Sequence, residues 1–344
     1  MAPTADDVTT LSRYPKELHE SRQLAAENNN ATPPTVALTG ATGFIGRTLT
    51  RRLCERGWKV RALVRSPARA FWLQQLGVVL IEGDLAGIEG LRQLVQGVDA
   101  VVHCAGAVRG VTQAQFDRVN VEGVRRLAEI SKQLPDQPRF LSLSSLAARE
   151  PQLSAYAASK RGGETALAET AGIMPWAAFR PPAVYGPGDK ELLPVFRLMA
   201  RGYAPLVAPA HARFSIIFVE DLANAMVQWL EQRDCAQGVF ELHDGHPGGY
   251  CWDDVIQVVE QLSARSIRRL RVPTALLRIP AGINWLAGQL LPHTPMLTPG
   301  KIRELTHADW VCDNRKIHQA TGWAPSVDLK EGLAQTPGWL PETR

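Results

Sequence analysis

The sequence predicts an α/β fold in which a doubly wound parallel sheet is joined to a smaller, mixed C-terminal domain. Two observations predict it. Short apolar runs alternate with helical patterns from residue 35 onward, and a glycine-rich turn follows the first of these runs directly. Strands that alternate with helices of this length are typical of a parallel sheet, because each crossover to a parallel neighbour needs a helix or a similar length of chain. At 344 residues the chain is long enough for this domain and a second one.

The first half of the chain holds the alternation in its most regular form. Strands are expected over residues 36–38, 60–64, 78–81, 100–104 and 140–143, and helices over 44–56, 68–76, 88–95 and 113–134. A helix over 156–171 and a strand over 176–179 continue the pattern, which becomes irregular between 181 and 189. Further helices are expected over 191–201, 221–232, 252–263 and 274–290, with strands over 214–219 and 239–242, before an end rich in proline, glycine and tryptophan.

These elements divide the chain into three parts. Residues 1–34 have too little apolar periodicity to be buried and are expected to form a mobile tail. Residues 35–187 are expected to form a Rossmann dinucleotide-binding domain, to which residues 212–244 return. Residues 188–211 and 245–344 are expected to form the substrate-binding domain.

Composition argues against several classes of function. The hydrophobic share is 45%, the charged share is 21% and the formal net charge is +4, with arginines scattered through helical patterns. We therefore expect a folded protein that binds no nucleic acid. The cysteines show neither C-x-x-C spacing nor histidines at metal-ligand distance, which indicates free thiols in a reducing cytoplasm and no bound metal. They are Cys54, Cys104, Cys235, Cys251 and Cys312.

Two segments of the sequence indicate whether the chain crosses or contacts a membrane. The first 34 residues lack the apolar stretch of a secretory signal, and the chain is expected to be cytoplasmic. The uncharged run over 279–300 has about the length of a membrane span, but four prolines interrupt it, so integral insertion is not expected. A peripheral contact through Ile279, Trp285, Leu286 and Leu290 is the alternative to a helix packed on the core of the substrate domain.

A turn that fits a pyrophosphate lies between the first strand and the first helix. Its sequence is Thr39-Gly40-Ala41-Thr42-Gly43-Phe44-Ile45-Gly46, with the spacing G-x-x-G-x-x-G. Glycines permit a sharp turn and a close approach of the backbone to an anion, while the helix N-terminus presents unpaired N–H groups to it. A glycine trio by itself can be a plain tight turn, but at this position it predicts dinucleotide binding.

The residue after the second strand bears on which dinucleotide is bound. A site specific for NAD usually carries an acid there for the ribose hydroxyls, and this chain has Arg65 instead. A guanidinium can pair with a 2′-phosphate through two hydrogen bonds. We therefore expect NADP(H) to be preferred, with NAD(H) as the alternative if Arg65 is only a solvated loop residue.

Tyr156 and Lys160 lie four residues apart, which places both on one face of a helix. A tyrosine of pKa ~10 transfers protons poorly at neutral pH, and an ammonium ~4 Å away can supply the roughly 4 kcal/mol that lowers this pKa by about three units. The pair follows the fifth strand and the hydroxyl run Ser142-Leu143-Ser144-Ser145. Open α/β sheets bind ligands at this edge. Ser145 is thus expected to hold a substrate oxygen while Tyr156 gives or takes its proton, with Ser144 as a supporting hydroxyl.

The order of these motifs resembles the extended short-chain dehydrogenase/reductase family, which includes NAD-dependent epimerases and dehydratases. The resemblance covers most of residues 35–245. Besides the glycine turn and the Ser/Tyr/Lys set, it rests on Asp84-Leu85, His103-Cys104-Ala105-Gly106, Asn120-Val121-Glu122-Gly123 and Arg180-Pro181-Pro182-Ala183-Val184-Tyr185-Gly186-Pro187-Gly188-Asp189.

The resemblance implies an NAD(P)-dependent oxidoreductase and gives its residues roles. Gly40, Gly43, Phe44, Ile45 and Gly46 would hold the pyrophosphate, Asp84 and Leu85 would border the adenine, Ala105, Gly106, Tyr156 and Lys160 would contact the cofactor, and Pro182, Ala183 and Val184 would line the nicotinamide. Lys160 would also reach the nicotinamide ribose. Asn120 either marks a helix irregularity that supports proton relay or bonds to neighbouring backbone. Family members often form homodimers through the helix that includes Tyr156 and the helix before it, so a homodimer is expected.

The second half of the chain bears on the substrate. Nucleotide-sugar enzymes of the family typically carry an arginine and a histidine where this chain has Phe214 and Phe218, although Arg213 is one residue away. The apolar helix opened by Pro273 and the segment Gly322-Trp323-Ala324-Pro325 look like the reductase and hydroxysteroid-dehydrogenase-like branches. A hydrophobic ketone or secondary alcohol is therefore the favoured small-molecule substrate. A nucleotide-sugar epimerase or dehydratase, and a non-catalytic NADP(H)-binding assembly protein, are the alternatives.

Overall fold

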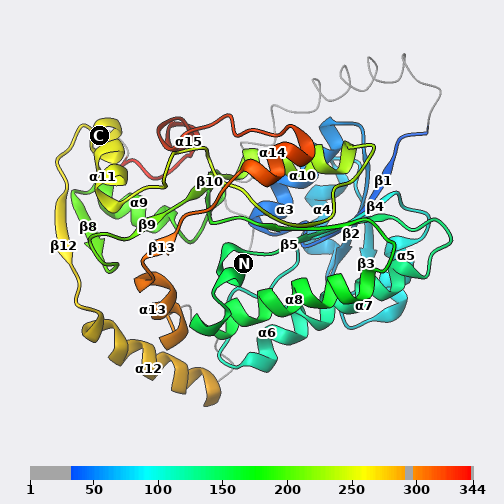
Figure 1. Ribbon diagram of the computed structural model, residues 1–344, viewed down its shortest axis with the longest axis horizontal. Helices are drawn as coiled ribbons and strands as arrows, with labels where there is room; N and C mark the ends of the chain where they lie inside the picture. Colours follow the sequence, from blue (N-terminus) through cyan, green and yellow to red (C-terminus); the bar gives the residue numbers. More distant parts are fainter. Residues whose placement is uncertain (1–31, 291–296, 342–344) are drawn as a thin grey trace.

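The computed structural model describes residues 32–290 and 297–341 (Figure 1). Up to residue 31, the expected tail lies outside the described residues. None of the helices in the described part of the chain combines the length and the apolarity needed to cross a bilayer.

A seven-stranded sheet forms the centre of the molecule, in the order β11-β6-β5-β4-β1-β2-β3. Its strands are β1 (Thr35–Thr39), β2 (Lys59–Val64), β3 (Val79–Glu82), β4 (Ala100–His103), β5 (Arg139–Leu143), β6 (Trp176–Arg180) and β11 (Gly238–Glu241). Neighbouring strands are parallel throughout. The predicted doubly wound parallel fold is therefore confirmed, and β11 joins the sheet from a segment far along the chain.

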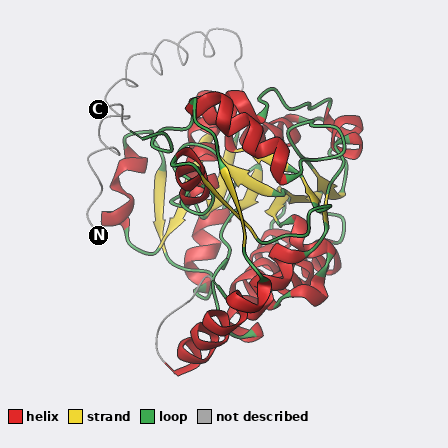
Figure 2. Cartoon of the chain, turned by 90° about the vertical axis from the view of Figure 1, so that its left-hand side faces the viewer, coloured by secondary structure: helices red, strands yellow, loops and turns green. Residues whose placement is uncertain are grey.

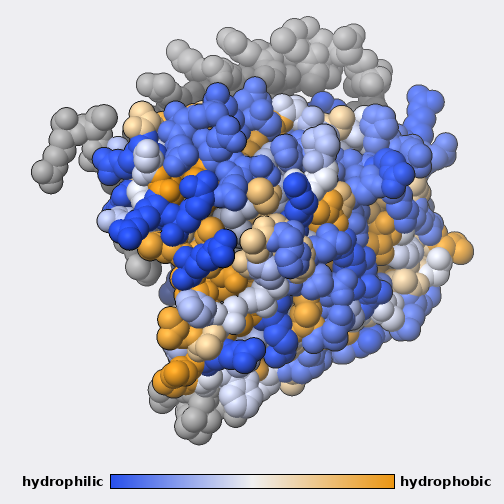
Figure 3. Space-filling view, turned by 60° about the vertical axis from the view of Figure 1, so that its left-hand side comes forward, coloured by the Kyte–Doolittle hydropathy of each residue, from blue (hydrophilic) through white to orange (hydrophobic). Residues whose placement is uncertain are grey.

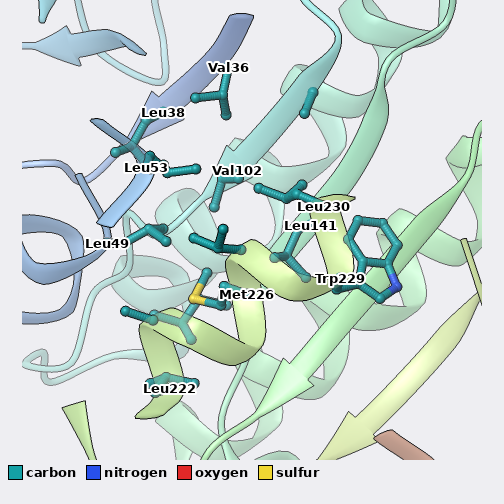
Figure 4. Close-up of a cluster of buried hydrophobic side chains, with 14 of the residues drawn as sticks. Val36, Leu38, Leu49, Leu53, Val102, Leu141, Leu222, Met226, Trp229 and Leu230 are labelled. Carbon is teal, nitrogen blue, oxygen red and sulfur yellow. The ribbon is translucent and has the colours of Figure 1, made fainter. Parts of the chain in front are cut away.

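Helices cover both faces of this sheet (Figure 2). On one face α3 (Phe44–Glu55) packs against α10 (Val219–Glu231), and α14 (Arg315–Thr321) lies beside them. Figure 4 shows Leu49 and Leu53 of α3 on one side of Met226 of α10, with Trp229 further along α10, over the apolar side of the sheet. The opposite face is covered by α5 (Ile88–Val95), α7 (Glu122–Lys132) and α8 (Ala155–Ala171), with α6 (Gln113–Asn120) packed on α8.

A second apolar core lies beside the sheet. It is built from β7 (Ala183–Tyr185), β10 (Ile216–Phe218), α9 (Leu193–Ala200), α11 (Trp252–Ser263) and α15 (Leu329–Gln335). Short parallel pairs extend it: β7 with β10, β8 (Tyr203–Leu206) with β12 (Arg268–Arg271), and β9 (Arg213–Phe214) with β13 (Asp309–Trp310). Two more helices, α12 (Thr274–Leu290) and α13 (Pro299–Thr306), pack on each other at the side of this core.

The structure corrects three expected elements. The helix over 113–134 is two helices, separated at Val121, where the backbone (φ −110°, ψ −62°) leaves regular helical geometry. The helix over 68–76 is instead a 3₁₀ turn, Pro67–Ala70, followed by the four residues of α4, Phe71–Gln74, and the backbone then reverses at Gly77, whose φ is +78°. The strand over 214–219 divides into β9 and β10, since Ser215 turns inward and its hydroxyl accepts a hydrogen bond from the Cys312 amide.

Candidate active site

The glycine turn between β1 and α3 is closely packed. Gly40 has a φ of +77°, and a Cβ added there would lie 2.6 Å from the amide nitrogen of Ala105. A Cβ on Gly46 would lie 2.0 Å from the carbonyl oxygen of Gly40. Both positions therefore require glycine, the first for its backbone conformation and both for space.

The N-terminus of α3 fits an anion. Gly43 is its N-cap and has no side chain to accept hydrogen bonds from the N-terminal amides, and the first turn carries no acid. Unpaired amides at a helix N-terminus bind phosphate groups well. The residues present therefore fit a dinucleotide pyrophosphate, with Phe44 and Ile45 following the cap in the first turn of α3.

Two further groups predicted to contact the cofactor follow β2 and β3. Arg65 is exposed directly after β2. The Asp84 carboxylate accepts hydrogen bonds from the amides of Ala86 and Gly87, at 2.8 and 2.9 Å, and so fixes the turn that presents Leu85. The Leu85 side chain packs against α7, where a Cβ on Gly123 would lie 2.9 Å from it.

The Ser145 hydroxyl lies close enough to the Tyr156 phenol to act on its pKa. Ser145 begins a 3₁₀ turn, Leu146–Arg149, directly after β5, and its hydroxyl accepts from the Ala147 amide at 3.2 Å. Tyr156 lies in the first turn of α8, whose cap Ser154 accepts from the Ala157 amide at 2.9 Å. Burial raises the pKa of Tyr156 to about 12, and the Glu304 carboxylate adds to the rise while the Ser145 hydroxyl opposes it. At neutral pH the phenol is a proton donor.

Lys160 is buried one turn further along α8. Its Nζ donates to the carbonyl oxygen of Leu143 at 2.9 Å, and burial lowers its pKa to about 8. The expectation that this ammonium lowers the Tyr156 pKa is wrong for the arrangement described, because burial dominates at Tyr156 and Lys160 is held by the β5 carbonyl instead. A Cβ on Gly106 would lie 3.0 Å from Nζ, which brings the loop after β4 against the lysine.

Asn120 sits at the interruption between α6 and α7. Its Oδ1 accepts from the Ala107 amide at 2.9 Å, and its Nδ2 donates to the Ala107 carbonyl at 3.0 Å and to the Ser159 hydroxyl at 2.9 Å. The irregularity and the backbone bonding that were expected as alternatives are thus both present. Asn120 holds the loop that contains Ala105 and Gly106 against α8.

A small polar cavity of about 10 Å³ lies behind Lys160, between β4, β5 and α8. By volume this is about the space of one water molecule. Its walls include His103, Ser144 and Glu164. His103 Nδ1 is 2.9 Å from the Thr39 hydroxyl, and Nε2 has no hydrogen-bond partner among the described residues. Burial, with the nearby Lys160 charge, lowers the pKa of the ring to about 3. The imidazole is therefore neutral at physiological pH.

No role was predicted from the sequence for three polar residues of the site: Glu164, Glu304 and His103. Glu164 accepts from the Ser144 hydroxyl at 2.5 Å and from Arg180 at 2.7 and 2.5 Å, so the Ser144 hydroxyl is bound to Glu164. The spacing of Glu164 from Lys160, four residues on one helix, is a signal that could have found it. Glu304 accepts from the Ser154 hydroxyl across 150 positions of sequence, and no local pattern indicates it. From the sequence, His103 was named only as part of the motif His103-Cys104-Ala105-Gly106.

The residues predicted to face the nicotinamide and the substrate are distributed between surface and core. Pro182 is half-buried, Ala183 is exposed and Val184 packs on the sheet core. Phe218 is 1% exposed and packs on Tyr185, with ring centroids 5.5 Å apart, so it belongs to the second core. Phe214 packs on Trp252 at 5.0 Å, and exposed Arg213 donates to the Gly249 carbonyl at 3.0 Å.

Residues 36–241 match the model of the NAD dependent epimerase/dehydratase family. The chain belongs to the NAD-dependent epimerase/dehydratase family. It is 38% identical to a ceramide reductase of Caulobacter vibrioides, over 89% of this chain and 96% of that protein. It is 28% identical to a 2-alkyl-3-oxoalkanoate reductase of Stenotrophomonas maltophilia, over 87% of this chain and 97% of that one. With these relatives, membership of the NAD-dependent epimerase/dehydratase family makes the chain an NAD(P)-dependent oxidoreductase.

Solved structures of the same fold include enzymes that act on nucleotide sugars. A UDP-glucuronic acid 4-epimerase from Bacillus cereus, in complex with NAD, superposes with a TM-score of 0.68. The match covers 88% of this chain and 97% of that one, at 18% identity. At this identity the likeness concerns the fold, so it does not choose between members of the NAD-dependent epimerase/dehydratase family that act on different substrates.

Proposed function

We propose that the chain interconverts a carbonyl group and a secondary alcohol on a hydrophobic small molecule, with Tyr156 as the acid and base. One observation carries the proposal: the loop after β4 touches both functional regions. Its Ala105 packs on Gly40 of the glycine turn and its Gly106 packs on Lys160. The turn that fits a pyrophosphate and the groups that fit a proton transfer therefore share one edge of the sheet, as cofactor-dependent reduction requires.

Each residue of the group has a separate role in the proposed reaction. A bound nicotinamide supplies or accepts the hydride at the carbon. Ser145 donates a hydrogen bond to the substrate oxygen, and in reduction Tyr156 transfers its phenolic proton to that oxygen. Lys160 orients the cofactor ribose and returns a proton to the Tyr156 phenolate after the transfer. Asn120 is a positioning residue, since it acts through the loop that carries Ala105 and Gly106.

The substrate is proposed to be lipid-like. Support comes from the names of the two reductases described above and from the departure at Phe214, which packs on Trp252. Phe218 no longer contributes, since it packs in the second core. The nucleotide-sugar alternative rests on Arg213, an exposed cation able to meet a phosphate. The alternative of a non-catalytic NADP(H)-binding assembly protein is disfavoured by the intact Ser145, Tyr156 and Lys160.

In the test, the purified chain is incubated with two panels of compounds in the presence of NADPH or NADP⁺. Long-chain ketones and secondary alcohols should change the absorbance of the cofactor and yield the reduced or oxidised product. UDP-, GDP- and dTDP-sugars should give neither product nor thermal shift. Product chromatography accompanies absorbance, because epimerases regenerate their cofactor within each cycle. Saturable binding of a nucleotide sugar that Arg213→Ala weakens would overturn the proposal.

A preference for NADP(H) is part of the proposal and rests on exposed Arg65 at the end of β2, with NAD(H) as the weaker cofactor. Arg65→Ala should weaken NADPH binding about tenfold more than NADH binding, as expected for the loss of one charge-assisted contact. Arg92→Ala on α5, which is also exposed, is the matched control. An unchanged ratio of the two dissociation constants would contradict the assignment.

The remaining assignments are a cytoplasmic homodimer, without nucleic acid or integral membrane insertion, and a division into two domains. In this division residues 35–187 and 212–244 bind the cofactor, and residues 188–211 and 245–344 bind the substrate. Support for the division comes from the two apolar cores and from β11, which pairs with β6.

A further inference from the structure

One face of α12 exposes a row of large apolar side chains. Leu276, Ile279 and Ile283 are 64%, 68% and 62% exposed. Their spacing, i, i+3 and i+7, places them on one side of the helix. We call these three residues the α12 face. Figure 3 shows apolar surface gathered at the lower left of the molecule, where α12 lies.

The α12 face is not the side by which the helix packs on the protein. Ala281 is fully buried, Leu277 is half-buried, and α12 contacts α13. A surface helix of a soluble domain usually turns its apolar side inward and its polar side to water. Here the outward side is apolar too, and a contiguous exposed patch of this kind marks an interaction site.

The chain segment that contains α12 carries charge of a single sign. From Gln261 through Arg303, both included, the chain has no aspartate or glutamate but seven arginines and lysines. Four of the seven belong to β12 and α12: Arg268, Arg269, Arg271 and Arg278. Arg269 pairs with Asp253, whereas no carboxylate of the described residues pairs with Arg268, Arg271 or Arg278. A partner that covers this surface must therefore be both apolar and anionic.

We propose that the α12 face inserts into the interface of an anionic phospholipid bilayer, with the arginines of β12 and α12 on the headgroup phosphates. Apolar residues beside basic ones are the composition with which peripheral helices lie in the plane of a membrane. The contact is peripheral. A protein partner would have to supply both an apolar surface and its own carboxylates, since Arg268, Arg271 and Arg278 have no carboxylate partner among the described residues.

The placement of α12 also matters for the active site. Trp285 of α12 donates through Nε1 to the carbonyl oxygen of Val111 at 3.3 Å, in the stretch between β4 and α6. The neighbouring α13 supplies Glu304, which accepts from Ser154 at the start of α8. If the proposed function holds, a lipid-like substrate that leaves the bilayer beside α12 arrives next to Tyr156. The docking itself does not depend on that function.

The test is flotation of the full chain with phosphatidylcholine vesicles, with and without phosphatidylglycerol. Binding should require phosphatidylglycerol and fall with added salt. Ile279→Gln combined with Ile283→Gln should reduce the bound fraction at least tenfold. Arg268→Ala and Arg271→Ala should each reduce binding about fivefold. Ile173→Gln is the matched control, since Ile173 is 86% exposed just beyond α8, and it should bind as the unmodified chain does.

Three results would overturn the proposal. Equal binding to neutral vesicles would show that the arginines do not contribute to binding. Full binding by the double glutamine variant would show that the α12 face is not the surface that contacts the bilayer. A dimer that this variant converts to a monomer in light scattering would make the face a contact between two copies of the chain. Turnover of a short, water-soluble ketone, which the double variant should retain, tests the proposed function separately from the flotation result.

Discussion

Burial moves the pKa values of Tyr156 and Lys160 in opposite directions, to about 12 and about 8. Each shift disfavours the charged form, as expected for groups taken out of water. Near neutral pH the tyrosine keeps its proton and most of the lysine keeps its charge. This combination suits reduction, in which Tyr156 is the donor, more than oxidation, in which the phenol must first lose its proton.

The phenolic hydroxyl of Tyr156 is expected to be needed for proton transfer but not for cofactor binding. Tyr156→Phe removes the proton donor but leaves the ring, which packs edge-on to Phe116 at 6.0 Å. Turnover should fall roughly 100- to 10,000-fold, the usual contribution of a positioned acid, with little change in the cofactor dissociation constant. Steady-state kinetics and cofactor titration measure the two effects. A variant with near-normal kcat would show that another group supplies the proton.

Lys160 should determine how reduction depends on pH. Its ammonium loses its proton as pH rises through about 8, so kcat/KM should be flat below that pH and fall above it. Tyr156 should add no decline in the usual assay range, because its pKa is about 12. Lys160→Arg keeps a charge across this range and should lose the decline, although its absolute rate is lower. A decline at the same pH in the arginine variant would assign it to a different group.

At the scale of elements, the glycine turn links fold stability to cofactor binding. Gly46→Ala puts a methyl group 2.0 Å from the Gly40 carbonyl oxygen, and backbone on both sides must move. Such overpacking costs about 1–3 kcal/mol or more of the free energy of unfolding. Urea unfolding should show this loss, and cofactor affinity should fall as well, because the α3 amides shift.

The control for this substitution is Gly282→Ala, where a Cβ meets no atom within 4 Å. Alanine is favoured over glycine inside a helix by about 0.5–1 kcal/mol, so this variant should be equally or more stable. It should also bind the cofactor normally. Equal stabilities of the two variants would mean that the turn tolerates a side chain.

The elements that sequence could predict are those long enough to show a period. All seven strands of the central sheet fall within or beside apolar runs that indicated them. The interruption at Val121 could not be predicted from periodicity, because the apolar pattern has the same phase on both sides of it; only the family resemblance indicated an irregularity, at the neighbouring Asn120. In the structure, the interruption lies where another helix comes close: a Cβ on Gly163 of α8 would lie 2.2 Å from the Asn120 carbonyl oxygen, so α6 and α8 approach closely there. In the C-terminal region, α13, α14 and α15 have eight residues or fewer, too short for a clear period.

At the scale of the whole molecule, the C-terminal region is joined to the rest of the chain by contacts between residues far apart in sequence. Arg149 donates to the carbonyl oxygens of Val311 and Asp309, each at 2.6 Å, and Tyr185 donates to the Asp328 carbonyl at 3.1 Å. No local pattern contains this information. For that reason the sequence indicated the motifs of the cofactor side in order, whereas Glu304 near Tyr156 and the burial of Phe218 became evident only in the structure.

Asp221 is the clearest of these long-range links. It is 1% exposed in α10, and its carboxylate accepts hydrogen bonds from the amides of Ser326 and Val327, both at 2.9 Å, and from the Ser326 hydroxyl at 2.7 Å. Asp221→Ala leaves the two amides and the Ser326 hydroxyl without their buried acceptor, and hydrogen bonds to charged groups are worth about 1.5–3 kcal/mol each. Since relaxation recovers part of this, the free energy of unfolding should fall by roughly 3 kcal/mol in urea titrations followed by tryptophan fluorescence and circular dichroism.

Asp221→Asn separates the geometry of this link from its charge. The amide oxygen can accept from both backbone amides, and the amide nitrogen can donate to the Ser326 hydroxyl, which is able to accept as well as donate. This variant should therefore lose only about 1 kcal/mol, the difference between charge-assisted and neutral hydrogen bonds. If the carboxylate joins the C-terminal region to the sheet, the alanine variant should also separate the fluorescence and circular dichroism transitions, while the asparagine variant keeps them coincident. Coincident transitions in both variants, with equal midpoints, would mean that the two cores are held together by other contacts.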